Sequence, residues 1–416
     1  MIDWPHELMP FQAQGVRLLV ERDRLLLADE MGLGKTVQAL AALRLLALRR
    51  EVESCLIVTP AAVLAQWRDR FAEWAPELRL ALVRGSPAER DGWWRAPAHA
   101  YLVGYETLRA DLALARTRAW DLVVVDEAQR IKSAGAEVAG AVKSLARRRA
   151  WALSGTPMEN RPADLVSILE FVRPHLEEDA PAVEQATSGL REQLAAVQLR
   201  RRKADVLPQL PASTVSELVL PMGAEQRGAY ERAERDGLVQ LRAVGPAVSV
   251  ASVLELIVRL KQLCNFDPAT GASAKLRDLD ERLSLLRESG ERSLVFTQFT
   301  DDTYGAQAIA RRLAAHRPLV VTGGLNLEQR ADVIERFGVD SAHGVLILSL
   351  RAGGVGLDLQ DASYVFHFDR WWNPAVEDQA TGRSHRIGQT RPVHVYTYTM
   401  EGTVEERIVE ILRSKR

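Results

Sequence analysis

Short apolar runs alternate with amphipathic stretches along the first 175 or so residues of the chain. Each run has the length of one buried strand, and the stretches between the runs have the length of helices, which is typical of strand–helix–strand units around a parallel sheet. The predicted strands are Leu25–Ala28, Cys55–Thr59, Tyr101–Val103, Leu122–Val125 and Trp151–Ser154, and the clearest helices are Thr36–Leu48 and Leu64–Trp74.

The pattern changes after residue 175 and returns near residue 273. The intervening stretch is mostly polar and helical, with apolar residues at three- and four-residue intervals from Val250 to Cys264 that predict one apolar helical face. Phe266–Ser273 has the composition of a linker. Predicted strands then resume at Leu294–Thr297, Leu319–Val321, Val345–Leu348 and Tyr364–Phe368.

Three parts are therefore predicted: residues 1–175, 176–272 and 273–416. The first and third are expected to be α/β lobes, each built on a parallel sheet, and the middle part a helical brace or insertion between them. A chain of 416 residues is long enough for two or three compact domains.

Composition and charge narrow the picture further. Apolar residues make up 47% of the chain and charged residues 26%, which excludes a disordered or fibrous protein. The net charge of −1 gives no overall attraction to nucleic acid, so any such site has to be a local groove. The distant Cys55 and Cys264 make neither a disulfide framework nor a metal spacing. With neither a signal peptide nor a bilayer-length apolar run, a cytoplasmic protein without membrane contact is expected.

A phosphate-binding loop is predicted where the first strand gives way to a helix. The segment Asp29–Thr36 reads DEMGLGKT, and its two glycines allow backbone N–H groups to face a phosphate at a helix N-terminus. Lys35 is expected to neutralise the β- and γ-phosphates of ATP, and the Thr36 hydroxyl to bind Mg²⁺. Asp29 stands where the general pattern has glycine. The alternative is a glycine-rich turn with an accidental lysine, which the strand before and the helix after disfavour.

Two adjacent acids follow the apolar strand Leu122–Val125. Asp126 and Glu127 would both lie at the carboxyl edge of the sheet, where open α/β sheets bind ligands. Asp126 is expected to hold Mg²⁺, and Glu127 to orient and deprotonate the attacking water. A solvated acidic turn is the alternative.

Two further polar turns are candidates for the same chemistry. Gln379, Arg383 and Arg386 form the pattern Q-x-x-G-R-x-x-R, which predicts two arginines on one face of a short helix. Such arginines would neutralise charge on a transferred phosphoryl group, although a surface pair in salt bridges is the alternative. Ser154, Gly155 and Thr156 form a hydroxyl-rich turn that is expected to sense the γ-phosphate, or to be only a turn.

The ordered set of motifs resembles the SWI/SNF-type ATPases of helicase superfamily two. The resemblance rests on DEMGLGKT, DEAQ, LSGTPMEN at 153–160 and QATGRSHRIGQ at 379–389, and this family also places Asp at the position of Asp29. Further segments match the family's motifs in the same order: Pro10–Gln12, Val58–Pro60, Gln66–Trp67, Gly104–Leu108, Leu199–Lys203, Val295–Phe299, Gly353–Asp358 and Trp372–Pro374. The chain departs from the family at Gly382, where Asp is usual, and in its shortened segment after residue 174.

The resemblance implies two RecA-like lobes with ATP-Mg²⁺ between them and nucleic acid across both. The residues it assigns to ATP are Gln12 on the adenine, Asp29, Met31, Gly32, Leu33, Gly34, Lys35, Thr36, Gly356, Asp358 and Gln379. For Asp358 a helix cap is the alternative. The candidate DNA contacts are Thr59, Pro60, Gln66, Trp67, Arg201, Gln298 and Trp372. Three of these have alternatives. Trp67 is also assigned to packing, Arg201 belongs to a charge run that is otherwise a solvated face, and Trp372 is otherwise half of a packed aromatic pair with Trp371.

The function expected from these features is ATP hydrolysis that drives a monomeric motor along double-stranded DNA, where it remodels or displaces a bound protein. An RNA or strand-separating helicase of the same superfamily is the nearest alternative. An ATP-gated nucleic-acid clamp with little turnover is the second. The sequence does not identify the displaced protein or the pathway.

Overall fold

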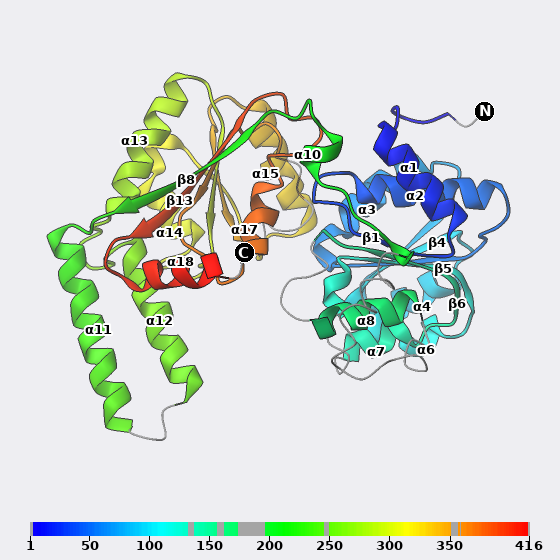
Figure 1. The fold of residues 1–416 in the computed structure, drawn as a ribbon, viewed down its shortest axis with the longest axis horizontal. Helices are drawn as coiled ribbons and strands as arrows, with labels where there is room; N and C mark the ends of the chain where they lie inside the picture. The colour runs from blue at the N-terminus through cyan, green and yellow to red at the C-terminus, as the bar shows by residue number, and fades with distance from the viewer. Residues whose placement is uncertain are drawn as a thin grey trace. The chain divides into compact units, whose positions relative to one another are not determined.

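The computed structural model describes residues 3–131, 137–155, 162–173, 196–244, 249–350, 357 and 359–414. The chain divides into two compact units, 1–209 and 210–416 (Figure 1). The predicted middle segment, 176–272, falls on both sides of this boundary, so the three-part division stays a prediction. No helix among the described residues is both long enough and apolar enough to span a bilayer.

Unit 1 is built on a parallel sheet of seven strands in the order β3-β4-β2-β5-β6-β1-β7. The strands are β1 (Arg24–Leu27), β2 (Cys55–Thr59), β3 (Leu80–Val83), β4 (Ala100–Gly104), β5 (Trp120–Asp126), β6 (Arg147–Leu153) and β7 (Gln198–Leu199). Its helices are α1 (Pro10–Glu21), α2 (Lys35–Leu48), α3 (Leu64–Trp74), α4 (Pro87–Arg95), α5 (Tyr105–Ala110), α6 (Leu112–Ala115), α7 (Glu137–Lys143), α8 (Pro162–Val172) and α10 (Lys203–Val206). Within this unit, α1, α2 and α3 lie on one side of the sheet, and α4, α6, α7 and α8 on the other (Figure 1).

Unit 2 is built on a second parallel sheet, of six strands in the order β10-β11-β9-β12-β13-β8. The strands are β8 (Ser213–Leu220), β9 (Ser293–Thr297), β10 (Leu319–Val321), β11 (Val345–Ser349), β12 (Tyr364–His367) and β13 (Val393–Met400). The helices are α11 (Ala224–Val244), α12 (Val250–Asn265), α13 (Ala274–Glu288), α14 (Ala306–Arg312), α15 (Leu327–Val339), α17 (Pro374–Thr381) and α18 (Val404–Ser414).

Both sheets are covered on both faces, which explains their continuous apolar strands. In β9, Leu294 and Phe296 belong to a core with Phe337 of α15, whereas Val295 faces the opposite core with Leu279 of α13. The predicted pair of parallel-sheet lobes is therefore confirmed, and all nine predicted strands occur within a few residues of their expected bounds. The strands β3, β7, β8 and β13 were not predicted.

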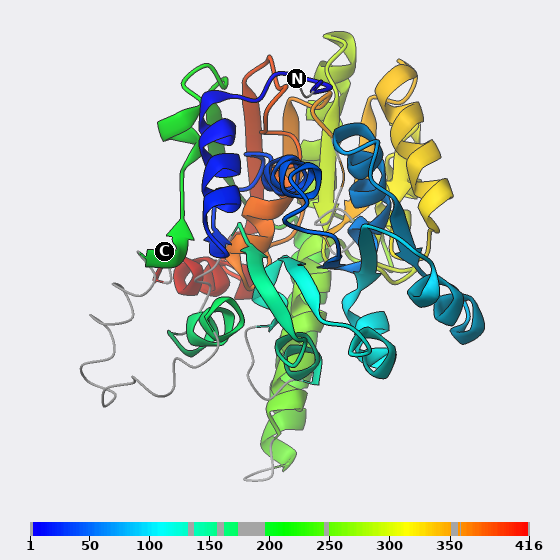
Figure 2. The ribbon, with the colours of Figure 1, turned by 90° about the vertical axis from the view of Figure 1, so that its right-hand side faces the viewer.

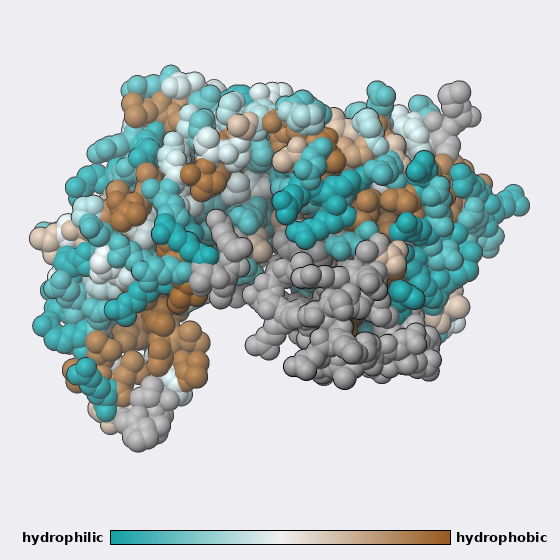
Figure 3. All heavy atoms as spheres, in the orientation of Figure 1, coloured by the Kyte–Doolittle hydropathy of each residue, from teal (hydrophilic) through white to brown (hydrophobic). Residues whose placement is uncertain are grey.

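The helix predicted around residue 257 is α12, which pairs with α11 as a hairpin that extends beyond the sheet of unit 2 (Figure 1, Figure 2). Its predicted apolar face is buried only toward its C-terminal end. Leu260 and Cys264 are buried there, whereas Val250 is 77% exposed and Val253 and Leu254 are also exposed. Figure 3 shows hydrophobic side chains gathered over the hairpin.

Candidate functional site

The phosphate loop, the acid pair and the hydroxyl turn meet at one edge of the unit 1 sheet. The strands β5, β6 and β1 are neighbours, with Leu153 paired to both Asp126 and Leu27. All strands of the sheet are parallel, so the segments that follow these three strands leave from the same carboxyl edge. The site predicted from three separate stretches of sequence is thus one place in the structure.

The loop before α2 has the backbone of a phosphate cradle. Gly32 and Gly34 have φ angles of 86° and 74°, a region that glycine enters without strain. No side chain caps α2 at its N-cap residue Gly34, and the first-turn N–H groups of any helix lack partners within the helix. The Lys35 ammonium folds back over the loop and donates to the carbonyl oxygens of Asp29 at 2.8 Å and Glu30 at 3.5 Å.

Gln12 of α1 lies against this loop. Its amide Nε2 donates to the carbonyl oxygen of Leu33 at 3.3 Å, and its Oε1 accepts from the backbone N–H of Met9 at 3.1 Å. A Cβ added to Gly34 would come within 2.5 Å of that same Nε2, so the loop and the glutamine are in close contact. The helix α1 therefore carries Gln12 to the loop at the start of α2.

Asp29 is completely buried and ion-paired. The Arg201 guanidinium donates to its carboxylate from Nε at 2.9 Å and from Nη2 at 2.5 Å, and the Gln38 amide donates to it at 3.2 Å. The backbone of the same segment is tied to the loop, since the Glu30 N–H donates to the Arg201 carbonyl at 2.9 Å and Ala28 N–H to that of Leu199 at 2.7 Å. Arg201, predicted as a candidate DNA contact, thus has its guanidinium turned into unit 1, where its side chain is 9% exposed.

The acid pair lies at the end of β5. The Trp67 indole donates to Asp126 Oδ2 at 2.7 Å, and the Glu127 N–H donates to Oδ1 at 2.9 Å. Burial and then the neighbouring Glu127 raise the pKa of Asp126 to about 6, against the opposing effects of the Trp67 hydrogen bond and the Lys35 charge. Glu127 has a φ of 51°, an uncommon conformation for a residue with a side chain, and such strained positions concentrate at functional sites.

A chain of hydrogen bonds joins the acid pair to the turn after β6. The Gln129 amide donates to Glu127 Oε2 at 2.6 Å, and the Ser154 hydroxyl donates to Gln129 Oε1 at 2.9 Å. A Cβ on Gly155 would lie 2.5 Å from Cγ of Met31 and 3.4 Å from Nζ of Lys35, so this turn packs against the phosphate loop. Gln129 was not predicted as a site residue, although its place in the DEAQ segment was a signal.

The structure places the two predicted arginines of unit 2 after a helix, not on one. The helix α17 ends at Thr381, and three-residue turn bonds follow, from Arg383 N–H to Ala380 and from Ser384 N–H to Thr381. The Ser384 hydroxyl donates to the Ala362 carbonyl, and this hydrogen bond attaches the turns to the segment before β12. Arg383 and Arg386 therefore share one loop that is fixed to the stretch after residue 358.

The remaining candidates are divided between core, surface and undescribed segments. Thr59 and Trp67 are buried, Gln66 is half-buried, and Pro60 follows β2 directly. Trp67 packs in the core, as one of its two predictions had it. Gln298 and Trp372 are half-buried and follow β9 and β12 at the carboxyl edge of the unit 2 sheet. The predicted residues Thr156, Gly356 and Asp358 lie outside the described residues.

The donor atoms at the unit 1 edge fit a magnesium–nucleotide complex. Asp126 and Glu127 supply carboxylate oxygens and Thr36 a hydroxyl, which are the hard oxygen ligands that Mg²⁺ prefers. The two glycines with positive φ and the start of α2, which no side chain caps, present backbone N–H groups that can bind the phosphates.

Comparisons with known proteins match this arrangement. The model of the SNF2-related domain matches residues 11–269, and that of the helicase conserved C-terminal domain matches residues 274–388. The chain belongs to the SNF2 family. It is accordingly an ATPase of the helicase class.

Relatives of this SNF2-family chain include an uncharacterized ATP-dependent helicase of Mycoplasma genitalium, 31% identical over 99% of this chain and 42% of that protein. A putative ATP-dependent helicase/translocase of Bacillus subtilis is 34% identical over 98% of this chain and 48% of that protein. The chain thus spans less than half the length of these curated relatives. A structure of the Sulfolobus solfataricus SWI2/SNF2 ATPase core in complex with dsDNA is 27% identical, covering 100% of this chain and 93% of that chain, with a TM-score of 0.49.

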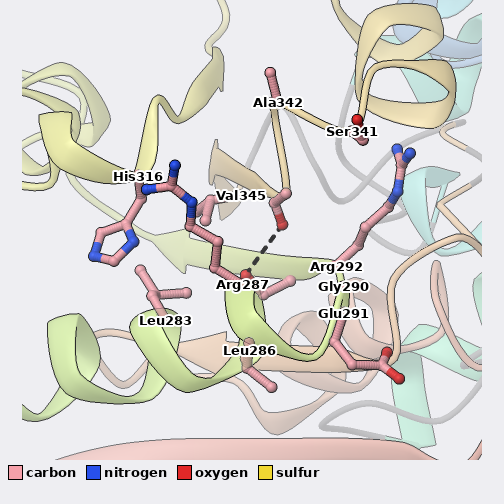
Figure 4. A pocket seen from close by; sticks show the side chains of 12 residues that line it. Leu283, Leu286, Arg287, Gly290, Glu291, Arg292, His316, Ser341, Ala342 and Val345 are labelled. Atoms are coloured by element: carbon pink, nitrogen blue, oxygen red, sulfur yellow. Dashed lines mark hydrogen bonds between the residues drawn. The ribbon is translucent and has the colours of Figure 1, made fainter.

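The described residues that line a separate pocket of unit 2 include none of the predicted site residues (Figure 4). The pocket is an open hollow at the amino ends of β9 and β11, lined by Arg287, Arg292 and His316 among others. The C-terminus of α13 ends there, and its dipole disfavours an anion. Parallel α/β sheets bind ligands at the opposite edge, so this pocket is no part of the predicted nucleotide site.

Proposed function

We propose that this SNF2-family ATPase hydrolyses ATP to move along double-stranded DNA and to displace or remodel proteins bound there. One observation carries the ATP chemistry. Lys35, the acid pair and Ser154 converge on one sheet edge, where the hydrogen-bonded chain from Glu127 through Gln129 to Ser154 passes beside the phosphate loop.

Each residue has a proposed role that follows from its chemistry. The N–H groups at the start of α2 and the Lys35 ammonium bind the phosphates. Thr36 and Asp126 hold Mg²⁺, which supplies positive charge to the transferred phosphoryl group. Glu127 accepts the proton of the attacking water, and its carboxylate is kept in place by the Gln129 amide.

The hydroxyl of Ser154 is proposed to report on the nucleotide. Its hydrogen bond to Gln129 means that a shift of the turn after β6 moves the partner of the general base. Arg383 and Arg386 are proposed to neutralise charge on the transferred phosphoryl group, so that hydrolysis depends on a rearrangement that nucleic acid can favour. This dependence is what converts hydrolysis into movement.

Duplex DNA is the proposed track, on the strength of the family and of its relatives' names. The Bacillus subtilis relative is named a helicase/translocase, and a mouse relative, 31% identical, is named as a SWI/SNF-related regulator of chromatin. The proposed contacts are Gln298 and Trp372, which follow β9 and β12 at the carboxyl edge of the unit 2 sheet, and the half-buried Gln66 in the first turn of α3. Pro60, like Thr59 and Trp67, is buried.

The decisive experiment compares steady-state ATP hydrolysis with duplex DNA, single-stranded DNA and RNA of equal length. The strongest stimulation is expected from the duplex, and Lys35→Ala serves as the control that removes hydrolysis in all three. Strongest stimulation by RNA would refute the duplex track. It would leave the ATPase assignment intact.

Ionic strength gives an independent test of the contact mode. A groove that binds phosphates releases counterions, so the logarithm of duplex affinity should fall linearly with the logarithm of salt concentration. Fluorescence anisotropy with a labelled duplex measures this slope. An affinity unchanged between low and high salt would contradict tracking along the phosphate backbone.

A further inference from the structure

Lys261 of α12 is a buried lysine with partners at two predicted DNA contacts. It is 1% exposed, and its Nζ donates to the Gln298 side-chain Oε1 at 3.0 Å and to the Arg370 carbonyl at 2.6 Å. The same ammonium stands 5.3 Å from the ring centre of Trp372. The Lys261 ammonium thus contacts the segment after β9 and the segment after β12, and it lies near the half-buried ring of Trp372 between β12 and α17.

The two segments are also joined beneath Lys261. Asp369 is completely buried, and its carboxylate accepts from Thr297 Oγ1 at 2.5 Å, from the Gln298 N–H at 2.9 Å and from Asn265 Nδ2 at 3.1 Å. The Gln298 backbone is therefore fixed by Asp369. The direction of its side chain is set by the Lys261 ammonium.

A second buried lysine in the same network has a different task. Lys275 of α13 pairs with Glu405 at 2.6 Å, both completely buried, and donates to Asn265 Oδ1 and to the Phe368 carbonyl. These contacts tie α13 and α18 to the core of the sheet, and none reaches Gln298 or Trp372. Lys261, by contrast, has no carboxylate of the described residues at hydrogen-bond distance, and its hydrogen bonds go to the two loop segments.

Charge makes Lys261 more than a packing residue. Burial lowers the pKa of its ammonium, while Asp369 and Glu405 oppose that effect. A buried ammonium is retained where its hydrogen bonds are satisfied, and a hydrogen bond from a charged donor is stronger and more directional than a neutral one. An apolar side chain of the same length would fill the space and would fix neither the Gln298 amide nor the Trp372 ring.

We infer that Lys261 is a positioning residue for nucleic-acid binding, which holds Gln298 and Trp372 as one surface and couples them to the α11–α12 hairpin. The inference rests on the proposed function, because it takes Gln298 and Trp372 as nucleic-acid contacts. It adds that the geometry of this surface depends on the C-terminal end of α12. A motion of the hairpin would then change the affinity for the track.

The test uses Lys261→Met, which keeps the length of the side chain and removes the ammonium. The full chain should need about tenfold more duplex DNA for half-maximal stimulation of ATP hydrolysis, because a charge-assisted hydrogen bond that orients a contact is lost. Arg259→Met is the matched control: it removes a positive charge from the exposed side of the same helix and should leave this concentration unchanged. Affinity for a fluorescent ATP analogue should be equal in all three proteins.

Gln298→Ala separates positioning from general damage. If Lys261 acts through Gln298, the double variant Lys261→Met with Gln298→Ala should bind duplex DNA little more weakly than the weaker single variant. Additive losses would mean that Lys261 acts elsewhere, and they would overturn the inference.

Amide hydrogen exchange decides the point without nucleic acid. In Lys261→Met, the peptide over 368–374, in which the Arg370 carbonyl loses its hydrogen bond, should exchange about tenfold faster, and the β11 peptide 345–349 should not change. Unchanged exchange in the 368–374 peptide refutes the inference, whatever the DNA assays give. A wild-type chain that duplex DNA fails to stimulate would refute the proposed function alone. If Lys261→Met does not fold, Gln298→Ala and Trp372→Leu should raise exchange at residues 258–265, and no rise in either variant refutes the link.

Discussion

Removal of the Arg201 guanidinium should destabilise unit 1 strongly, because it strands a buried carboxylate. In Arg201→Met, Asp29 stays completely buried and loses both guanidinium hydrogen bonds, and of its donors among the described residues the Gln38 amide at 3.2 Å remains. The variant also loses the contacts of Arg201 with the Phe11 carbonyl and with Gln38 Oε1 at 2.8 Å.

The expected size follows from the burial of both partners. Breaking a buried ion pair by removing one partner destabilises a protein by about 3–5 kcal/mol. We therefore expect a loss of about 3–5 kcal/mol in the opening free energy of unit 1.

Native-state hydrogen exchange of amides in β1 and β6 measures this opening free energy within the whole chain. The double variant Asp29→Asn with Arg201→Met should lose much less than the sum of the two single variants, since neither partner is then left charged and alone. Affinity for a fluorescent ATP analogue should fall in Arg201→Met, because the loop that carries Lys35 is tied to this pair. Losses that add within about 0.5 kcal/mol would show that the two side chains do not act as a pair, and the reasoning would fail.

The remaining predictions concern other groups of the chain. Glu127→Gln should abolish steady-state ATP hydrolysis while nucleotide binding survives, because an amide cannot accept the proton of water; retained turnover would contradict the role of Glu127 and favour another base. Burial, and secondarily Arg370, lowers the pKa of His367 to about 3, so its proton binds only the unfolded chain between pH 6.5 and 3. Stability should therefore fall as the pH drops below 6.5, by about 2 kcal/mol at pH 5 from this group, and His367→Asn should flatten the urea-midpoint profile over that range. Cys55 and Cys264 are completely buried, and burial raises the pKa of both thiols, so neither should react with a thiol reagent until the chain unfolds; rapid labelling of the native protein would contradict this burial.

Much of the fold could be predicted because its central strands are buried on both faces. A run such as Cys55–Thr59 has no polar position to interrupt it, and β2 matches its predicted bounds. The strand β8 could not be found in this way. Its sequence STVSELVL has neither a regular alternation nor a continuous apolar run, it is largely exposed, and its partner β13 lies about 180 residues further along the chain.

The site shows the same division between local and distant information. Lys35, Thr36 and the acid pair belong to short motifs whose backbone context is read within a dozen residues, and the structure brings them to one sheet edge. Arg201 looked like part of a surface charge run because its partner, Asp29, is 172 residues away in sequence. Gln129 belongs to the DEAQ segment, but its hydrogen-bond partner Ser154 is 25 residues away in sequence. Lys261 lies in no motif, and its partner Gln298 is 37 residues away.

The edge strands of the second sheet decide how this protein can be divided for expression. The helicase C-terminal match covers residues 274–388, and a gene fragment cut there would omit both β8 and β13. The strand β12 would become an open edge, and its four residues would offer unpaired N–H and C=O groups to other chains. Such a fragment should aggregate. A fragment that begins before Ser213 and retains Met400 keeps β12 paired with β13, and β13 paired with β8.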